Sequence, residues 1–262
     1  MKLGERMKEY EFQSRTRLLR RLPVIIRLDG CHFHTWTRGL DKPYDTHLTR
    51  IMQSVTKYLC EHIQGCVLGY TQSDEITLVL IDYQNQETDA WFDNQVQKIC
   101  SVSASLASVA FNKYLQEMIK ELEIDAMAWE HDEEYQQMSF CYEKAELLEQ
   151  KMWKAIFDAR AFNVPKHEVI NNLIWRQQDA TRNSINLVGQ SLYSHKELQG
   201  ISAKDLQNKM LIEKNVNWND YPTSFKRGSC VIRKDRKWVI DDEIPIFTQD
   251  RYYIDRLVQI EQ

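Results

Sequence analysis

One segment of the 262-residue chain constrains the fold more than any other: residues 23–36, PVIIRLDGCHFHTW. Val24, Ile25 and Ile26 favour a buried β-strand, and the proline before them breaks a preceding helix. The strand stops at Asp29-Gly30, where a carboxylate can hold a divalent cation and a glycine lets a phosphate approach the backbone. Asp-Gly is also one of the commonest turn dipeptides. On this segment alone a plain turn is the simpler interpretation, so the rest of the chain has to decide.

Composition excludes several classes of protein. Apolar residues make up 43% and charged residues 27%, which is ordinary for a globular protein. No apolar run approaches the ~20 residues of a membrane-spanning helix, and the first 15 residues are too polar for a secretory signal. The six cysteines form no CxxC pair and no zinc spacing. We therefore expect reduced thiols in a cytoplasmic protein with no membrane contact.

Charge is distributed unevenly along the chain. Residues 121–150 hold ten acids and one base, Lys144, so this segment carries −9 while the whole chain carries −4 and the remainder +5. Charge clusters are usually solvated faces, and a polyanionic partner needs support from elsewhere. The basic clusters are Arg15, Arg17, Arg20 and Arg21, and Lys226, Arg227, Arg233, Lys234, Arg236 and Lys237.

Strand and helix patterns alternate in the first 165 residues. Asp45 or Thr46 can cap the helix after the first strand, and Gly65 can end it. The turn at residues 71–75 separates two apolar runs, as in a hairpin. We expect helices over residues 5–22, 46–64, 89–121 and 142–153, a hairpin over 66–81 and a last strand over 155–164.

This order, β-α-β-β-α-β, is the ferredoxin-like arrangement. A right-handed crossover makes the strand at 66–70 parallel to the first strand, and the hairpin makes the next strand antiparallel to both. If that third strand lies beside the first, Asp29 and Gly30 meet Ser73, Asp74 and Glu75.

From Pro165 the chain changes character, which suggests a soft boundary. We expect helices over residues 169–193 and 203–214, the second capped by Ser202, and a loop over 215–222. Apolar residues around Cys230 and Trp238 flank a basic turn as a hairpin.

Paired aspartates at adjacent strand ends suggest metal chemistry. Asp29, Asp74 and the Gly30 carbonyl form the oxygen-rich site that Mg²⁺ prefers. Two such ions are a standard solution for in-line displacement at phosphorus. Backbone N–H groups after Gly30 could cradle a triphosphate, with further ligands from side chains. These candidates are Cys31, His32, Phe33, His34, Lys42, Ser73 and Lys98.

Ordinary structural roles compete with each of these assignments. Ser-Asp-Glu is common turn chemistry, and His32 and His34 near a strand end are more often structural. Cys31 suits a small buried position, and Lys98 suits a solvated helix face. The predicted meeting of Asp29 with Asp74 makes the functional interpretation as good as the structural one.

Two motifs together resemble a known family. RLDGCHFHTWT (27–37) and GYTQSDEITL (69–78) are similar to the tRNA-His guanylyltransferase family and its bacterial and archaeal relatives, the Thg1-like proteins. The resemblance covers nearly the whole chain except the acidic segment. Its further matches are Lys42-Pro43, Lys98 with Ala104-Ser105, residues 157–160, Trp175-Arg176-Gln177 with Asp179, residues 217–220 and Lys226-Arg227-Gly228.

The resemblance implies an α+β fold with a palm like that of polymerases and nucleotide cyclases. An antiparallel sheet with helices on one face would form a catalytic domain over residues 1–165, with 121–150 as an acidic insertion. Residues 166–262 would form a mainly helical, fingers-like region with the basic hairpin. The oligomer implied is a homotetramer.

The resemblance also implies chemistry: nucleotide addition to the 5′ end of tRNA in the 3′-to-5′ direction, with ATP or GTP as substrates. Two Mg²⁺ ions would be held by Asp29, Gly30 and Asp74, with Glu75 as a further catalytic residue. Ser73, Lys42 and Lys98 would be triphosphate ligands, and Arg160 and Asn186 more loosely so.

One departure from the family concerns the substrate. Eukaryotic members carry His-Ile-Asn-Asn where residues 180–186 here read ATRNSIN, and Arg182-Asn183-Ser184 resembles the Thg1-like subgroup, which is associated with template-directed repair of 5′-truncated tRNA. We expect repair. The alternatives are guanosine addition to tRNA-His, a catalytically inactive RNA-binding scaffold and a nucleotide cyclase. The expected tRNA contacts are Arg182, Asn183, Ser184, Lys226, Arg227, Arg233, Lys234, Arg236 and Lys237.

Overall fold

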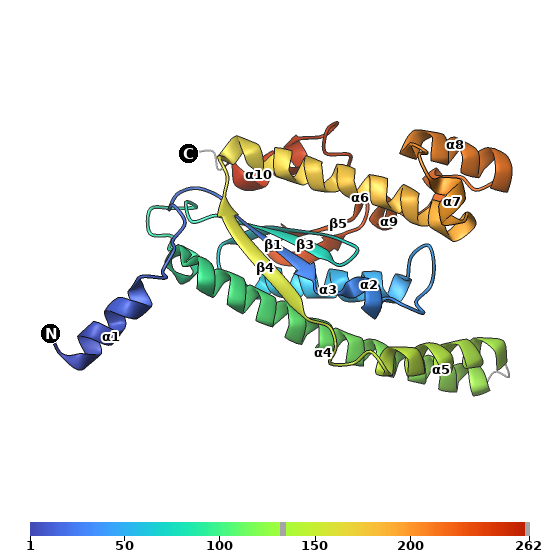
Figure 1. The fold of residues 1–262 in the computed structure, drawn as a ribbon, viewed down its shortest axis with the longest axis horizontal. Coiled ribbons are helices and arrows are strands. Elements are labelled where there is room, and N and C mark those ends of the chain that lie inside the picture. The colour runs from blue at the N-terminus through green and yellow to red at the C-terminus, as the bar shows by residue number, and fades with distance from the viewer. Residues whose placement is uncertain (132–134, 260–262) are drawn as a thin grey trace.

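A computed structural model describes residues 1–131 and 135–259 of the chain. A six-stranded antiparallel sheet in the order β4-β1-β3-β2-β5-β6 lies between two layers of helices (Figure 1). Asp132, Glu133 and Glu134 of the acidic segment fall outside the described residues.

The first four strands form the predicted palm. The third strand, β3, lies between the first two, and β4 flanks β1 on its other side, so the β-α-β-β-α-β prediction is confirmed. Two helices, α3 and α4, cover one face of this sheet (Figure 1). The bounds are β1 Val24–Gly30, α3 Thr46–His62, β2 Cys66–Gln72, β3 Glu75–Leu80, α4 Val96–His131 and β4 Phe157–Asn163.

Successive side chains of β1 point to opposite faces of the sheet and so enter both hydrophobic cores. Val24, Ile26 and Leu28 pack with α3 and α4, while Ile25 packs on the opposite face with Leu173 of α6. Because successive side chains of a strand point to opposite faces, an all-apolar run requires cover on both sides. The polar side chains of the strand, Arg27 and Asp29, lie in its last four residues.

The helix after the first strand begins as predicted. Asp45 is its N-cap and accepts a hydrogen bond from Leu48 N at 3.0 Å. Ile51, Val55 and Leu59 are buried on one stripe. Short turns surround this region: α2 at Phe33–Trp36 and the 3₁₀ helix η1 at Trp91–Asn94.

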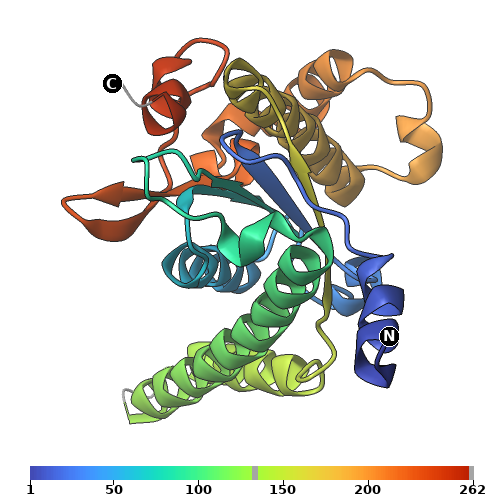
Figure 2. The ribbon, with the colours of Figure 1, turned by 90° about the vertical axis from the view of Figure 1, so that its left-hand side faces the viewer.

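The bounds of three predicted helices are wrong: residues 5–22, 89–121 and 142–153. The helix α1 covers only Leu3–Phe12, and none of its residues is buried, so no tertiary contact extends it to residue 22. The helix α4 runs on to His131 because it packs against α5 (Tyr135–Glu149) as a helical hairpin, which extends from the body in Figure 2. The acidic segment is therefore mostly helical.

The C-terminal region covers the other face of the sheet and also extends it. The helix α6 (Val169–Leu192) and α8 (Ala203–Lys214) match the predictions. The predicted hairpin forms as β5 (Ser229–Lys234) and β6 (Lys237–Asp241), and β5 pairs with the edge of β2. The remaining elements are η2 Lys166–Glu168, α7 His195–Leu198, η3 Trp218–Asp220, α9 Thr223–Arg227 and α10 Tyr252–Val258.

The division into residues 1–165 and 166–262 stays a prediction, although the second part supplies two strands to the sheet of the first. All six cysteines are free. Among the described residues, no helix combines the length and the apolar character needed to cross a membrane.

Candidate functional site

Carboxylates gather at one end of the central strands. Asp29 on β1 is directly opposite Glu75 on β3 and Asp158 on β4. Opposed residues of antiparallel strands share a face, so the three lie side by side on the face that α6 covers. The Gly30 N–H donates to the carbonyl of Asp74 at 3.1 Å. The structure therefore brings Asp29 and Asp74 together, as the topology predicted.

Among the residues that the structure describes, neither Asp29 nor Asp74 forms an ion pair. Burial, and then the charges of Glu75 and Asp158, raise the pKa of Asp29. Burial also raises the pKa of Asp74, to which the charges of Asp29 and Glu75 add, against a hydrogen bond from Ser73 Oγ at 3.0 Å. A site that crowds ionised carboxylates in this way favours a cation.

Glu75 has a different task. Arg27 binds one of its carboxylate oxygens at 2.7 Å, and Arg176 on α6 binds the other. Arg176 also contacts Asp179 at 3.1 Å, so the network ties the strand end to α6. Glu75 was predicted as a catalytic residue, but both of its oxygens are engaged in this link. Asp29 and Asp74 are the carboxylates that remain free for a metal.

Asp158 is the acidic neighbour that sequence reasoning missed. It is exposed on β4, with Arg160 at 3.6 Å and Cys31 Sγ at 3.8 Å from its carboxylate. The sequence held a signal for this residue, because Asp158 belongs to the segment 157–160 that matches the family. Only the antiparallel register of β4 with β1 places it opposite Asp29.

These residues fit Mg²⁺. The donors are hard carboxylate oxygens, and the pKa of each aspartate is raised by its acidic neighbours as well as by burial. A bound dication would relieve that repulsion. Asp29 and Asp74 would hold it, with the Gly30 carbonyl as a further oxygen at the same strand end.

The raised pKa values predict that the site destabilises the fold without metal. The pKa of each aspartate is higher in the folded protein than its unfolded value of about 3.9. The free energy of unfolding therefore falls as the pH rises from about 3.9 to the folded-state pKa. Above the folded-state pKa it stays at this lower value. We expect Asp29→Asn to raise the free energy of unfolding by about 0.5–2 kcal/mol at pH 7 without Mg²⁺. Urea denaturation measures this.

The control for that experiment is Glu117→Gln, an exposed carboxyl on α4, which should change stability little. Adding Mg²⁺ should stabilise the wild type and not Asp29→Asn. A variant less stable than the wild type without Mg²⁺ would refute the electrostatic account.

The segment after Gly30 packs on the core and turns its backbone outward. Phe33 is only 3% exposed and lies against Trp36, Phe111 and Phe157. Its side chain is therefore unavailable to a nucleotide, contrary to the broadest form of the prediction. The Cys31 N–H is also engaged, since it donates to Ile156 O at 2.9 Å.

Three backbone donors of this segment remain open. Within the described part of the chain, the N–H groups of His32, Phe33 and His34 have no hydrogen-bond acceptor. Both histidine side chains are exposed. A triphosphate cradle can therefore use these three N–H groups but not that of Cys31.

Gly30 is needed for close packing rather than for an unusual φ. A Cβ at this position would lie 2.3 Å from the Phe33 ring. We expect Gly30→Ala to displace Phe33 and the open donors, and to cost about 1–3 kcal/mol of folding free energy. Thermal unfolding and nucleotide binding both test this. Gly4→Ala, with nothing near its added Cβ, is the control, and equal behaviour of the two variants would contradict the packing argument.

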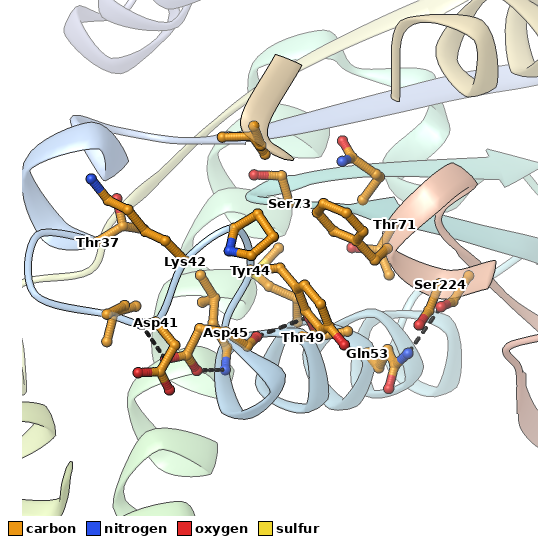
Figure 3. A pocket seen from close by; sticks show the side chains of 18 residues that line it. Thr37, Asp41, Lys42, Tyr44, Asp45, Thr49, Gln53, Thr71, Ser73 and Ser224 are labelled. Atoms are coloured by element: carbon orange, nitrogen blue, oxygen red, sulfur yellow. Dashed lines mark hydrogen bonds between the residues drawn. The ribbon is translucent and has the colours of Figure 1, made fainter. Parts of the chain in front are cut away.

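A cavity of about 200 Å³ opens next to Ser73, at the turn between β2 and β3 (Figure 3). Residues 37–45, α3, the end of β2 and α9 line it. Lys42 and Ser73 face it together, and Tyr44 stacks on Phe225 at a centroid distance of 4.5 Å. Because Ser73 precedes Asp74, the cavity adjoins the carboxylates. The predicted ligands Lys42 and Ser73 are thus brought together.

Lys98 lies elsewhere. Ser108 Oγ accepts a hydrogen bond from Phe157 N, and Phe157 is opposite Gly30, so this turn of α4 lies at the level of the site. Lys98 is ten residues earlier, about 15 Å along the helix, where its Nζ lies 5.7 Å from the centre of the Phe92 ring. Lys98 is therefore not brought to the carboxylates or the cavity lining, and its role as a triphosphate ligand stays a prediction.

The two remaining candidates for triphosphate ligands, Arg160 and Asn186, lie nearer the site. Arg160 is exposed on the same face as Asp158. Asn186 is half-buried on α6, next to Leu187, which lines the cavity.

The expected tRNA contacts divide into buried and exposed groups. Ser184 is fully buried, donates to Thr181 O at 2.8 Å and accepts from Trp218 Nε1 at 3.1 Å. It joins α6 to η3 and cannot touch tRNA, so that prediction is wrong. Arg182 and Asn183 are exposed beside it, and Arg182 pairs with Asp179.

The basic residues of the C-terminal region lie in two places. Lys226 and Arg227 are half-buried on α9, and Lys226 Nζ donates to Asn219 O at 2.5 Å. Ser229 at the start of β5 is opposite Thr71, near the site, and the hairpin tip is about 17 Å further along that strand. The exposed basic residues of the tip are Arg233, Lys234, Arg236 and Lys237.

An antiparallel palm sheet with paired aspartates beside its central hairpin suits metal-assisted transfer at phosphorus. The family model described as tRNAHis guanylyltransferase matches residues 4–165, more than half of the chain. The chain belongs to this family of nucleotidyltransferases.

Solved structures and curated relatives agree with this assignment. A bacterial tRNA(His) guanylyltransferase (Thg1)-like protein in complex with ATP is 42% identical, with a TM-score of 0.84 over 99% of this chain and 100% of that one. A second, in complex with GTP, is 36% identical with a TM-score of 0.74 and the same coverage. The probable tRNA(His) guanylyltransferase of Bos taurus is 24% identical over 88% of this chain and 74% of its own length.

Proposed function

We propose that this protein adds nucleotides to the 5′ end of truncated tRNA in the 3′-to-5′ direction, guided by the opposite strand of the acceptor stem. The pairing of Asp29 with Asp74 beside the cavity carries the proposal. The similarity to the bacterial structures that contain ATP and GTP supports a nucleoside triphosphate as substrate. Arg182-Asn183-Ser184, in place of the eukaryotic signature, favours repair.

Each predicted group has a defined chemical task. Asp29, Asp74 and the Gly30 carbonyl would hold two Mg²⁺ ions, which activate an attacking oxygen and neutralise the leaving pyrophosphate. The tRNA 5′ phosphate first attacks the α-phosphorus of a nucleoside triphosphate and displaces pyrophosphate. The 3′-hydroxyl of an incoming nucleotide then attacks the activated 5′ phosphorus and displaces a nucleoside monophosphate. Glu75 orients the strand end through its arginine pairs rather than binding metal.

The nucleotide would bind between the carboxylates and the cavity. Lys42, Ser73 and the open N–H groups of His32 to His34 would hold the triphosphate, and the cavity beside Tyr44 would take the nucleoside. Watson–Crick pairing selects the base, so the protein needs to read only the shape and phosphates of the tRNA. The exposed cations of α6 and of the β5–β6 hairpin suit that task. Homotetramer formation remains a prediction from the family, and a cytoplasmic location remains a prediction from the scattered cysteines.

The alternative within the same class is guanosine addition to tRNA-His, favoured by the curated guanylyltransferases among the relatives. The decisive experiment offers the protein a tRNA without its first nucleotide and a full-length tRNA-His, with Mg²⁺ and all four nucleoside triphosphates. Preferred extension of the truncated tRNA by the templated base supports repair. Extension of full-length tRNA-His alone, by guanosine alone, refutes it.

Two alternatives from other classes make different predictions. An inactive RNA-binding scaffold would extend neither tRNA with any divalent metal, although it has no need to keep Asp29 and Asp74 paired. A nucleotide cyclase would convert ATP or GTP to a cyclic monophosphate without tRNA, and the C-terminal helices and basic hairpin would then have no role.

A further inference from the structure

The acidic segment has a single base, Lys144, and the fold buries it. The Lys144 side chain on α5 is only 4% exposed. Its Nζ lies 2.8 Å from Asp41 Oδ2 and forms an ion pair with Asp45 Oδ2. Both aspartates belong to the loop that carries Lys42, so a helix of the acidic hairpin reaches across to a wall of the cavity.

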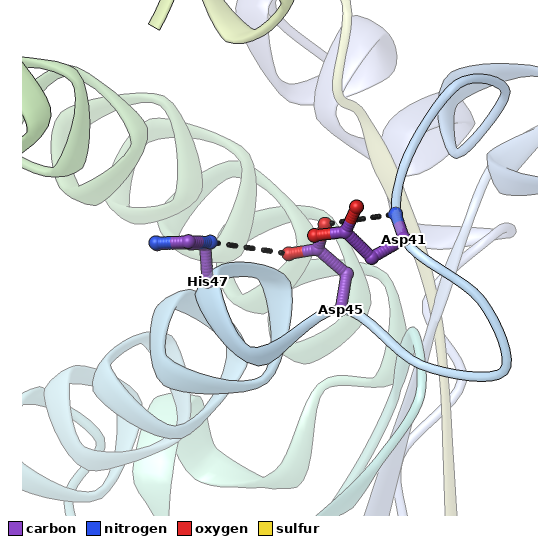
Figure 4. A group of neighbouring side chains, drawn as sticks. All are labelled: Asp41, Asp45 and His47. Carbon is purple, nitrogen blue, oxygen red and sulfur yellow. Dashed lines mark hydrogen bonds and ion pairs between the residues drawn. The ribbon is translucent and has the colours of Figure 1, made fainter. Parts of the chain in front are cut away.

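Asp45 is the central acceptor of this arrangement. Its carboxylate accepts a hydrogen bond from Leu48 N at 3.0 Å, which caps α3. It also accepts one from Asp41 N at 3.2 Å, which closes the loop (Figure 4). Burial alone would raise the pKa of Asp45, but the hydrogen bonds from Lys144 and Leu48 outweigh it and lower that pKa. Burial likewise opposes the charge of Lys144, and its bonds to Asp41 and Asp45 raise its pKa above the ordinary value. Both directions favour the ionised pair.

A metal ion is not the natural occupant here. Ligand atoms of Asp41, Asp45 and His47 lie within 4.8 Å of one another (Figure 4). The ammonium group of Lys144 already contacts both carboxylates, and it supplies the positive charge that an ion would bring.

A second lysine strengthens the same connection. Lys151, just after α5, donates to Trp36 O at 2.6 Å and to Arg38 O at 2.7 Å. The Trp36 indole Nε1 donates back to Lys151 O at 3.2 Å. The loop at residues 36–45 is therefore held at both ends by the hairpin, with Lys144 as its buried charge contact.

We propose that Lys144 is a positioning residue for the nucleotide cavity, and that the acidic hairpin serves to hold the loop bearing Lys42 and Tyr44. The proposal rests on the proposed function, in which that cavity takes the nucleotide. Without Lys144, Asp45 would be a buried charge with no cation, and the loop would shift to hydrate it. A displaced loop weakens nucleotide binding while the metal-binding aspartates stay in place.

The test compares Lys144→Met with Lys113→Met, an exposed lysine on α4. Calorimetric titration with ATP and with GTP in the presence of Mg²⁺ gives Kd, and tRNA extension gives KM and kcat. We expect Lys144→Met to raise Kd and KM for the nucleotide at least tenfold and to leave kcat within threefold. Lys144→Arg, which keeps the cation, should restore Kd to within threefold, and Lys113→Met should match the wild type.

Stability is measured in parallel, because a merely structural lysine would lower the melting temperature without changing Kd. That result overturns the proposal, as does a fall in kcat at constant KM. If Lys144→Met fails to fold, Lys144→Gln keeps a hydrogen-bond donor without the charge and is held to the same criteria. A wild-type protein that binds no nucleotide refutes the proposed function itself, whereas equal binding by the wild type and folded Lys144→Met refutes only the inference.

Discussion

Asp29→Asn and Asp74→Asn should each lower the rate of nucleotide addition by on the order of 10³-fold or more. Asparagine keeps the shape of the side chain but removes the negative charge, so the proposed two-metal site loses a charged ligand. Glu75 cannot substitute, because Arg27 and Arg176 hold its oxygens. Single-turnover extension of a 5′-truncated tRNA measures the rate, and filter binding measures tRNA affinity, which should stay within about threefold of the wild type.

Asp89→Asn is the matched control, because this carboxylate is highly exposed, with Arg20 at 3.8 Å. The expected gain of stability in Asp29→Asn without Mg²⁺ distinguishes lost chemistry from misfolding. Activity of either site variant within tenfold of the wild type would contradict the assignment of Asp29 and Asp74 as metal ligands.

Phe111→Ala should cost about 3–5 kcal/mol of folding free energy. Phe111 is fully buried on α4, and its ring lies 5.1 Å from Trp36, 5.4 Å from Phe33 and 5.7 Å from Phe157, centroid to centroid. These rings form the floor under the segment that follows Gly30. The substitution therefore leaves a cavity among these rings, and the elements that carry them cannot close it by moving together. Urea denaturation measures the loss.

Phe140→Ala is the control for that variant, since Phe140 on α5 is 50% exposed. It should change the free energy of unfolding by less than about 1 kcal/mol. Equal losses for the two variants would contradict the account of the aromatic floor. Phe111→Ala should also weaken nucleotide binding, because Phe33 would no longer fix the open backbone donors.

The palm could be predicted because its signals are local. Apolar alternation, the Asp45 cap and Gly65 each act within a few residues, and the handedness of the crossover then left few arrangements of three strands. Bringing Asp29 to Asp74 required only that β3 lie beside β1. The length of α4 was underestimated because its partner, α5, comes later in the chain.

Several site residues could not be placed from the sequence. Ser184 belongs to a motif that resembles the family, yet its hydroxyl is already hydrogen-bonded to Thr181 O and Trp218 Nε1. Lys98 occurs at a family position, but the distance along α4 separates it from the carboxylates. Motif matching assigns residue types, and it does not say which atoms are already bonded.

By itself the sequence determined the order of the palm elements, the strand that ends at Asp29-Gly30 and the pair of aspartates. Each of these follows from propensity, periodicity and chirality over short stretches of chain. Only the tertiary structure decided that β5 pairs with β2, that Arg176 neutralises Glu75 and that Lys144 holds the loop of Lys42. These contacts join residues about 100 to 160 positions apart. They depend on which sheet edges and buried charges remain unsatisfied once the local elements have packed.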